Sequence, residues 1–377
     1  MNINNKNLII KIERAISELR RGGKLVISDI TKGTSLILVA AELIEPETIH
    51  EMSQLSLSRP NIVLSSNRSE AIGIKTHKKP CSIMIKKHWS ISDILSLCMP
   101  LYGKEKPTMD GVVLENEDSI SSYCLLILRQ ARLLPAGLVA ITSNIPIENI
   151  NEWAFKNNLL HIDVVDIKLY ETVNADSLTM SVKAKVPIAQ TDNCEIIIFR
   201  PKDGGDEHFC LIFGKTRDVL NSKDHNHIPL TRVHSQCITG DILDSLKCDC
   251  GQQLKEAIKM MSVADEGVLI YLAQEGRDIG LLNKLRAYSL QEKGMDTVDA
   301  NIALGFNDDE RLYYPAKQIL KKINIKSIKL ITNNPKKVEH LSNLGVNIYE
   351  RVSIKVDPNK HNEKYLETKS KKSGHFL

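Results

Sequence analysis

The chain has 377 residues, of which 42% are hydrophobic and 25% charged, so it is long enough for two or three ordinary globular domains. Its formal net charge of +4 is too small over this length to indicate nucleic-acid binding, and no apolar run approaches the roughly 20 residues of a membrane helix. The N-terminus lacks a signal-peptide pattern and most of the eight cysteines are scattered, so we expect a cytoplasmic protein that binds neither nucleic acid nor membrane.

The first half of the chain alternates helical and strand patterns. An amphipathic helix ends at Gly22-Gly23, and a polar stretch of mixed pattern over 171–185 closes the segment. Between them, strands are expected at 24–28, 36–41, 62–64, 83–85, 137–142 and 161–165, and helices at 123–133 and 153–158. This alternation indicates an α/β or α+β domain, a mixed sheet with flanking helices, over residues 1–175.

This first segment resembles 3,4-dihydroxy-2-butanone 4-phosphate synthase in its opening helix, its V-I-S-D strand end and its L-L-P-A-G-L-V-A-I-T stretch. That family follows its first strand with a loop rich in Asp and Glu that holds Mg²⁺. Here the loop after Asp29 has no carboxylate until Glu42, and S-I-S-S-Y-C-L replaces the segment that brings a catalytic His and Glu. We expect a domain that keeps the fold and has lost the chemistry.

The second half predicts another mixed sheet with flanking helices, over residues 184–377. Strands are expected at 195–199, 208–213, 229–234, 267–272 and 327–332. Helices are expected at 251–261, 278–292 and 315–323, and a last one after Asn334-Pro335, with an acidic loop over 296–311. The first two strands read as a hairpin, and the predicted helix over 278–292 has Leu281, Leu282 and Leu285 spaced for one face.

Three cysteines lie within fourteen residues in this half: Cys237, Cys248 and Cys250. Grouped thiols without secretory features indicate metal ligation, and thiolates suit tetrahedral Zn²⁺. Three ligands leave a fourth position for water, which favours a catalytic zinc. The alternative is a closed structural site in which His234 completes a Cys3His set.

Two further groups of polar residues suggest a ligand site. Glu275, Gly276 and Arg277 follow a predicted strand, where α/β proteins commonly build ligand sites, although a surface ion pair is the alternative. Lys336 and Lys337 lie in a first helical turn, where the helix dipole disfavours cations. Their presence suggests a bound phosphate, the alternative being a merely exposed lysine pair.

The second half resembles GTP cyclohydrolase II from about Ala184 to Leu377. Seven motifs occur in order: R-V-H-S-x-C-x-T-G-D, S-L-x-C-D-C-G, Q-E-G-R-x-I-G-L, R-A-Y, D-T-V-x-A-N, L-G-F-x-x-D-E-R and T-N-N-P-K-K. The resemblance implies hydrolysis of GTP to a diaminopyrimidine nucleotide, formate and pyrophosphate in riboflavin biosynthesis. It also implies one Zn²⁺ per chain, Mg²⁺ with the GTP phosphates, and a homodimer.

The resemblance assigns roles to individual residues. Cys237, Cys248 and Cys250 would hold zinc, Asp309 would accept a proton, Arg311 would act at the α-phosphate, and Tyr288 would be a further catalytic group. Arg311 is either a charge stabiliser or a covalent nucleophile, and the second role requires its deprotonation. The GTP contacts would be Arg232, Val233, His234, Ser235, Gln236, Gln253, Glu275, Gly276, Arg277, Thr297, Thr332 and Lys337.

One residue departs from the family pattern. Gln236 stands where the family usually has Glu, and an amide cannot carry charge or act as a base. Two alternatives therefore stay open beside a monofunctional cyclohydrolase: a bifunctional enzyme with an active first domain, and a non-catalytic zinc-holding regulator.

Overall fold

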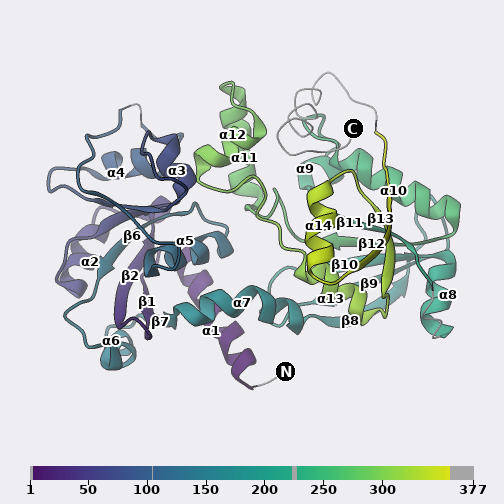
Figure 1. Cartoon of the computed structure of the whole chain (residues 1–377), viewed down its shortest axis with the longest axis horizontal. Helices are drawn as coiled ribbons and strands as arrows, with labels where there is room; N and C mark the ends of the chain where they lie inside the picture. Colours follow the sequence, from purple (N-terminus) through teal and green to yellow (C-terminus); the bar gives the residue numbers. More distant parts are fainter. Residues whose placement is uncertain (1–2, 104, 223–226, 357–377) are drawn as a thin grey trace. The chain divides into compact units, whose positions relative to one another are not determined.

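The computed structural model describes residues 3–103, 105–222 and 227–356 (Figure 1). The chain forms two compact units, one made of Met1–Tyr170 with Leu282–Glu310 and the other of Glu171–Leu281 with Arg311–Leu377. The first unit therefore takes in a segment from the middle of the second half. The sequence-based domains 1–175 and 184–377 stay a prediction.

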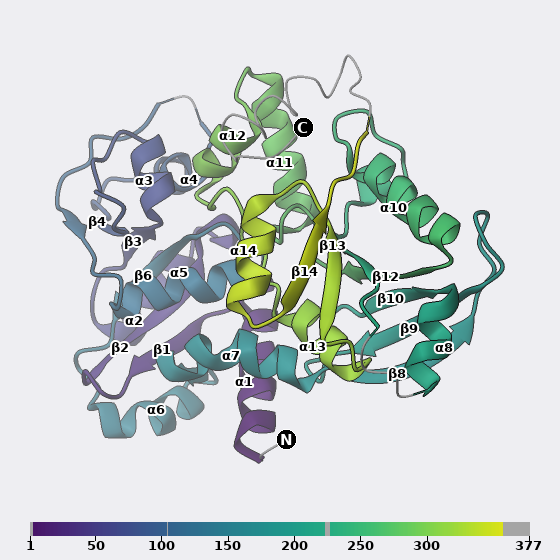
Figure 2. The same cartoon turned by 45° about the vertical axis from the view of Figure 1, so that its right-hand side comes forward.

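A seven-stranded mixed sheet of order β5-β4-β3-β6-β2-β1-β7 forms the centre of the first unit (Figure 2). Only the β1–β7 pair is parallel. Its strands are β1 (Leu25–Asp29), β2 (Thr34–Ala40), β3 (Asn61–Leu64), β4 (Cys81–Met84), β5 (Val112–Leu114), β6 (Ala136–Ile141) and β7 (Leu160–Asp163). Its helices are α1 (Ile3–Arg20), α2 (Thr48–Ser56), α3 (Ser66–Ala71), α4 (Ile91–Cys98), α5 (Ile120–Gln130), α6 (Ile150–Lys156), α11 (Gly280–Glu292, from Leu282), α12 (Thr297–Leu304) and the first half of α7 (Val164–Ser177).

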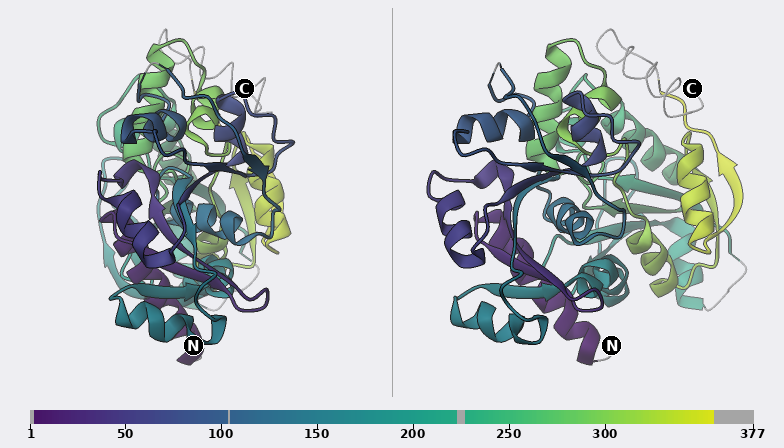
Figure 3. Two further views of the ribbon diagram at one scale, coloured as in Figure 1. Left: turned by 90° about the vertical axis from the view of Figure 1, so that its left-hand side faces the viewer. Right: turned by 60° about the vertical axis from the view of Figure 1, so that its left-hand side comes forward.

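Apolar residues on both faces of β2 explain how helices cover the sheet. Ile37 and Val39 point to one face and pack in a cluster with Met52 of α2 and Ile94 of α4. The intervening residues, among them Leu38, are equally buried and point to the opposite face because side chains alternate along a strand. Helix α5 contacts β1, β2 and β6, as the views in Figure 3 illustrate.

The second unit has its own seven-stranded mixed sheet, of order β14-β13-β11-β12-β10-β9-β8. The strands from β14 to β12 are parallel, and those from β12 to β8 are antiparallel. They are β8 (Thr179–Lys185), β9 (Cys194–Arg200), β10 (His208–Phe213), β11 (Leu230–Ser235), β12 (Glu266–Leu272), β13 (Ser327–Ile331) and β14 (Asn347–Val352). The helices are α8 (Gly214–Ser222), α9 (Ile238–Asp241), α10 (Cys250–Ala264), α13 (Tyr314–Lys322) and α14 (Pro335–Asn343).

The two-sheet α/β fold class is confirmed, and so are the β9–β10 hairpin and the Asn334 cap of α14. Two expectations are wrong. Half of the expected acidic loop is helix α12, capped by Asp296. The predicted apolar face of α11 is exposed, because Asn283, Ala287 and Leu290 form the buried face instead. None of the helices in the described ranges is both long and apolar enough to cross a membrane.

Candidate functional site

The three predicted thiols come together in the second unit. Among the described residues, Cys237, Cys248 and Cys250 form a group whose sulfur atoms all lie within 4.8 Å of one another. The Sγ atoms of Cys237 and Cys248 are 3.7 Å apart. Two thiolates bound to one tetrahedral zinc at about 2.3 Å would lie about 3.8 Å apart, so this spacing fits zinc.

Without a bound cation, the surroundings of these thiols favour their protonated forms over the thiolates. Hydrogen bonding to Cys237 and partial burial raise the pKa of Cys248 to about 11, and the pKa of Cys250 is raised for the same reasons. A divalent cation reverses this effect, because it stabilises each thiolate directly. The donor set is therefore one that a soft cation would stabilise.

Two glycines make room for the cluster. A methyl group at Gly240 would lie 2.8 Å from Cys248 Sγ and 3.0 Å from Cys237 Sγ. At Gly251 it would lie 2.0 Å from the carbonyl oxygen of Gly240. The T-G-D and C-D-C-G motifs thus need glycine because helices α9 and α10 approach closely where the thiols meet.

His234 points to a carboxylate in this structure. Its Nε2 lies 3.2 Å from both oxygens of Asp241, and burial lowers its pKa. Asp241 also accepts hydrogen bonds from the backbone N–H of Cys237, at 3.0 Å, and from the hydroxyl of Tyr271, at 2.8 Å. Asp241 therefore links the first cysteine of the cluster to His234 and Tyr271.

Arg232 is buried at the centre of the second sheet. It donates to the side-chain oxygen of Gln253, at 2.6 Å, and to the carbonyl of Ile331, at 3.0 Å. Gln253 in turn donates to Asp249, between two of the cysteines, at 2.6 Å. Burial lowers the pKa of Arg232, although nearby Asp249 opposes the effect. The guanidinium is thus fixed between β13 and the cysteine-bearing helix α10.

Glu275 holds the backbone beside the first cysteine. It is 4% exposed and accepts hydrogen bonds from the N–H groups of Ile238, at 2.6 Å, and Gly276, at 2.9 Å. The interpretation as a surface ion pair is therefore wrong for Glu275. Gly276, Arg277 and Asp278 follow with φ of 65°, 60° and 74°. Two successive non-glycine residues in the left-handed region are strained, as is common in ligand-binding loops.

Lys337 is 5% exposed, so the interpretation as an exposed lysine is wrong for it. Its ammonium donates to the carbonyl of Val233, at 2.7 Å, and lies 5.6 Å from the centre of the Tyr313 ring. Thr332 precedes helix α14, which carries Lys337. It is buried, and its hydroxyl accepts a hydrogen bond from the N–H of Asn334. These residues lie at the start of α14, where backbone N–H groups and the helix dipole favour an anion.

The predicted second-unit residues converge because three parallel strands end together. Strands β11, β12 and β13 lead into Gln236, Gln274 and Thr332 respectively. Ligands of open α/β sheets bind outside the carboxyl ends of such strands.

Several buried polar atoms at this edge have no hydrogen-bond partner among the described residues. They are Arg232 Nε, His234 Nδ1, Ser235 Oγ and Gln274 Oε1. Buried polar groups are rarely left unsatisfied, so their concentration here indicates a place where a polar ligand completes them.

Three predicted residues lie on the segment that belongs to the first unit. Tyr288 is on α11, Thr297 begins α12, and Asp309 follows α12. Arg311 opens the next stretch of the second unit. Each is partly buried, and the hydroxyl of Thr297 accepts a hydrogen bond from Gln291 at 3.4 Å.

The sequence interpretation missed Asp241, Tyr271 and Gln274. Asp241 and Gln274 lie inside motifs quoted above. Their place in these motifs could have marked them as site residues, but it did not indicate what they do. Tyr271 lies within an apolar strand, and nothing in the sequence distinguishes it from a core residue.

Comparison with known proteins covers nearly all of the chain. A sequence model of the GTP cyclohydrolase II family matches residues 179–353. GTP cyclohydrolase-2 of Azospirillum brasilense is 36% identical over 97% of this chain and 94% of its own length. Riboflavin biosynthesis protein RibBA of Endomicrobium trichonymphae is 32% identical over 96% of both. GTP cyclohydrolase-2 of Haemophilus influenzae is 48% identical over 48% of this chain and 82% of its own length.

Proposed function

Because the chain belongs to the GTP cyclohydrolase II family of riboflavin biosynthesis, we propose that it is the zinc-dependent form of this enzyme. It hydrolyses GTP to 2,5-diamino-6-(5-phosphoribosylamino)pyrimidin-4(3H)-one, formate and pyrophosphate. The observation that carries the proposal is the group of three thiols at a sheet edge lined with unsatisfied polar atoms.

Cys237, Cys248 and Cys250 are the zinc ligands in this proposal. Zinc held by these residues would supply an activated water for opening the imidazole ring. The open site is supported because the group of possible metal ligands among the described residues consists of the three thiols and includes neither ring nitrogen of His234. Asp241 orients Cys237 through its backbone N–H.

The phosphates and base are bound by the remaining second-unit residues. Lys337 and Arg232 supply positive charge close to the start of α14, and Mg²⁺ accompanies the triphosphate. The remaining contacts to GTP in the second unit are made by Ser235, Gln236, Gln253, Glu275–Arg277 and Thr332, with Val233 and His234 beside them. Gln236 keeps hydrogen-bonding capacity without charge, which is sufficient for a binding role.

Three residues carry the remaining chemistry. Asp309 accepts a proton. Tyr288 is a further catalytic group beside the guanine base of GTP. Arg311 stabilises the charge that develops at the α-phosphate, a role that its guanidinium performs without deprotonation. A nucleophilic Arg311 is the second possibility, and it requires loss of a proton to a base such as Asp309.

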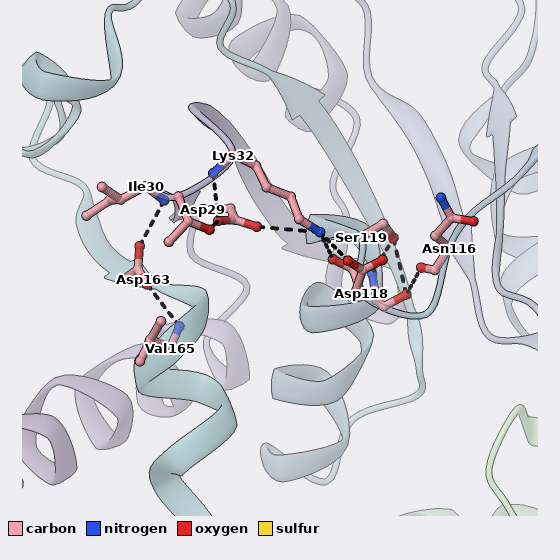
Figure 4. Close-up of polar contacts among 10 residues, drawn as sticks. Asp29, Ile30, Lys32, Asn116, Asp118, Ser119, Asp163 and Val165 are labelled. Atoms are coloured by element: carbon pink, nitrogen blue, oxygen red, sulfur yellow. Dashed lines mark hydrogen bonds and ion pairs between the residues drawn. The ribbon is translucent and has the colours of Figure 1, made fainter.

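The first unit is catalytically inactive in this proposal. Lys32 donates to the Asp118 carboxylate at 2.6 Å and lies 4.0 Å from Asp29, so its ammonium occupies the space between the two acids (Figure 4). This hydrogen bond raises the pKa of Lys32 and lowers that of Asp118. Asp29 is further engaged by the hydroxyl of Thr31 at 2.6 Å. An ammonium between these carboxylates would compete with a hard cation for their oxygens, which disfavours the bifunctional alternative.

The protein acts in the cytoplasm as a homodimer in this proposal. The family resemblance supports both statements.

Cys248→Ser tests the proposal directly. Loss of one thiolate should remove zinc and abolish formate release from GTP together. Cys194→Ser is the matched control, because Cys194 is equally buried in the same unit and lies on β9, outside the thiol group. Full formate release by a zinc-free Cys248→Ser protein would refute the proposal. Zinc binding without any turnover of GTP would instead favour the non-catalytic regulator.

A further inference from the structure

Helices α11 and α12 belong to the second half of the sequence, yet they are held by the first unit. The segment Leu282–Glu310 carries Tyr288, Thr297 and Asp309. Helix α12 contacts α3 of the first half, and Figures 1 and 2 both show the two helices adjacent. The contacts that hold this segment are specific and largely buried.

Arg68 is the central contact. It is 3% exposed and its three donating nitrogens each reach a backbone carbonyl: Leu97 at 2.7 Å, Ala303 at 3.0 Å and Ser96 at 3.2 Å. These carbonyls lie in the last turns of α4 and α12, where helices leave carbonyl groups unsatisfied and the dipole favours a cation. Burial lowers the pKa of Arg68 to about 10, so it stays charged at neutral pH. One guanidinium thus joins the ends of two helices.

Hydrogen bonds and an ion pair hold the chain that follows α12 on both sides of Asp309. Ser65 donates to the carbonyl of Gly305 at 2.7 Å, and Asn67 donates to the carbonyl of Phe306 at 2.8 Å. On the other side, Glu310 pairs with Arg129 at 3.6 Å. A methyl group at Gly305 would lie 2.8 Å from Ser65 Oγ, so the two segments pack without spare space.

Helix α11 is anchored next to Tyr288. Arg286 pairs with the buried carboxylate of Glu42, whose other oxygen accepts the N–H of Leu134 at 2.9 Å. Asn283 is fully buried and donates to the carbonyl of Arg132 at 2.8 Å. Glu42 is the first acid after Asp29, and it serves this contact.

We propose that the first unit is the positioning scaffold for the cyclohydrolase reaction, with Arg68 and Asn67 as positioning residues for the segment that carries Tyr288 and Asp309. The proposal rests on the catalytic roles given above to those two residues. It assigns the inactive synthase-like unit a task in GTP turnover. Because small displacements of catalytic groups strongly reduce the rate, the contacts of Arg68 and Asn67 control kcat more than substrate binding.

The test uses zinc-loaded full-length protein and measures kcat and KM for formate release from GTP, with zinc content. Arg68→Met should lower kcat by about 10- to 100-fold, and Asn67→Ala by about 3- to 10-fold, with smaller changes in KM. Zinc should stay bound, because the thiol group is in the other unit. Arg68→Lys should recover part of the activity, since it keeps the charge and some donors.

Ile83→Ala is the control for loss of stability. Ile83 is fully buried in the first sheet, in a core cluster without residues of Leu282–Glu310, so its truncation weakens the unit and removes no side chain that makes these contacts. Its kcat should stay within about twofold of wild type. If Arg68→Met does not fold, the partly buried Asn67→Ala decides the test.

Wild-type kcat in both Arg68→Met and Asn67→Ala would overturn the scaffold role, and so would an equal loss in Ile83→Ala. Absence of formate release by the wild-type protein would instead refute the proposed function itself.

Discussion

Replacing Gly240 by alanine should weaken zinc binding without removing any ligand. The added methyl group would lie 2.8 Å from Cys248 Sγ, 3.0 Å from Cys237 Sγ and 3.1 Å from Cys250 Cβ. Ordinary contacts between heavy atoms begin at about 3.5 Å, so the contact with Cys248 Sγ would be about 0.7 Å too short. All three cysteines are affected, and they cannot move apart while sharing one metal.

The magnitude follows from this overlap. Adding a methyl group to a filled site costs about 1–3 kcal/mol. If the strain falls on the zinc-bound state, zinc affinity drops by about 5- to 150-fold. Formate release at limiting zinc should fall in proportion, and saturating zinc should restore much of it.

Competition with a chromophoric zinc chelator measures this change in affinity. Gly345→Ala is the matched control: it is strained by a φ of 84° but has open space around it and lies away from the thiols. It should lower stability and leave zinc affinity unchanged. Wild-type zinc affinity in Gly240→Ala would show that the thiols do not share one metal in this arrangement.

Three further predictions concern the assigned roles. His234→Ala should keep about one zinc per chain, because neither of its ring nitrogens belongs to the group of possible metal ligands; loss of metal, measured by elemental analysis, would identify a closed Cys3His site. Arg311→Lys should release pyrophosphate about 100-fold more slowly, since charge is kept and the planar fork lost; complete loss, with an acid-stable nucleotide adduct in the native enzyme, would indicate a nucleophile instead. Ribulose 5-phosphate should not be converted, because Lys32 lies between Asp29 and Asp118; dihydroxybutanone phosphate above a no-enzyme control would contradict this.

The sequence predicted best where chemistry depends on local spacing. Cys248 and Cys250 are separated by one residue, so their proximity to each other follows from local spacing, and the structure brings Cys237, which was also predicted, to the same place. The hairpin of β9 and β10 and the Asn334 cap follow from local turn and capping preferences. Periodicity failed in α11, where the predicted apolar face of Leu281, Leu282 and Leu285 is exposed.

The parts that could not be predicted depend on contacts distant in sequence. In the sequence alone, nothing distinguishes Arg68 from a surface cation. Its burial depends on the carbonyl of Ala303, 235 positions later. Glu42 resembles an isolated acid until its pairing with Arg286 is seen. Asp241 stands in a recognisable motif, but its three hydrogen bonds require the positions of β11 and β12. A single sequence gives residue types and local conformational preferences, and neither identifies hydrogen-bond partners that are distant in the sequence.

The most direct measurement of the central claim is the stoichiometry of GTP turnover by the zinc-loaded full-length chain. GTP, formate and pyrophosphate are followed in one reaction with Mg²⁺ present. We expect one formate and one pyrophosphate for each GTP consumed, and no formate after zinc is removed by a chelator. Unchanged GTP with zinc bound, or equal formate release by the zinc-free protein, would contradict it.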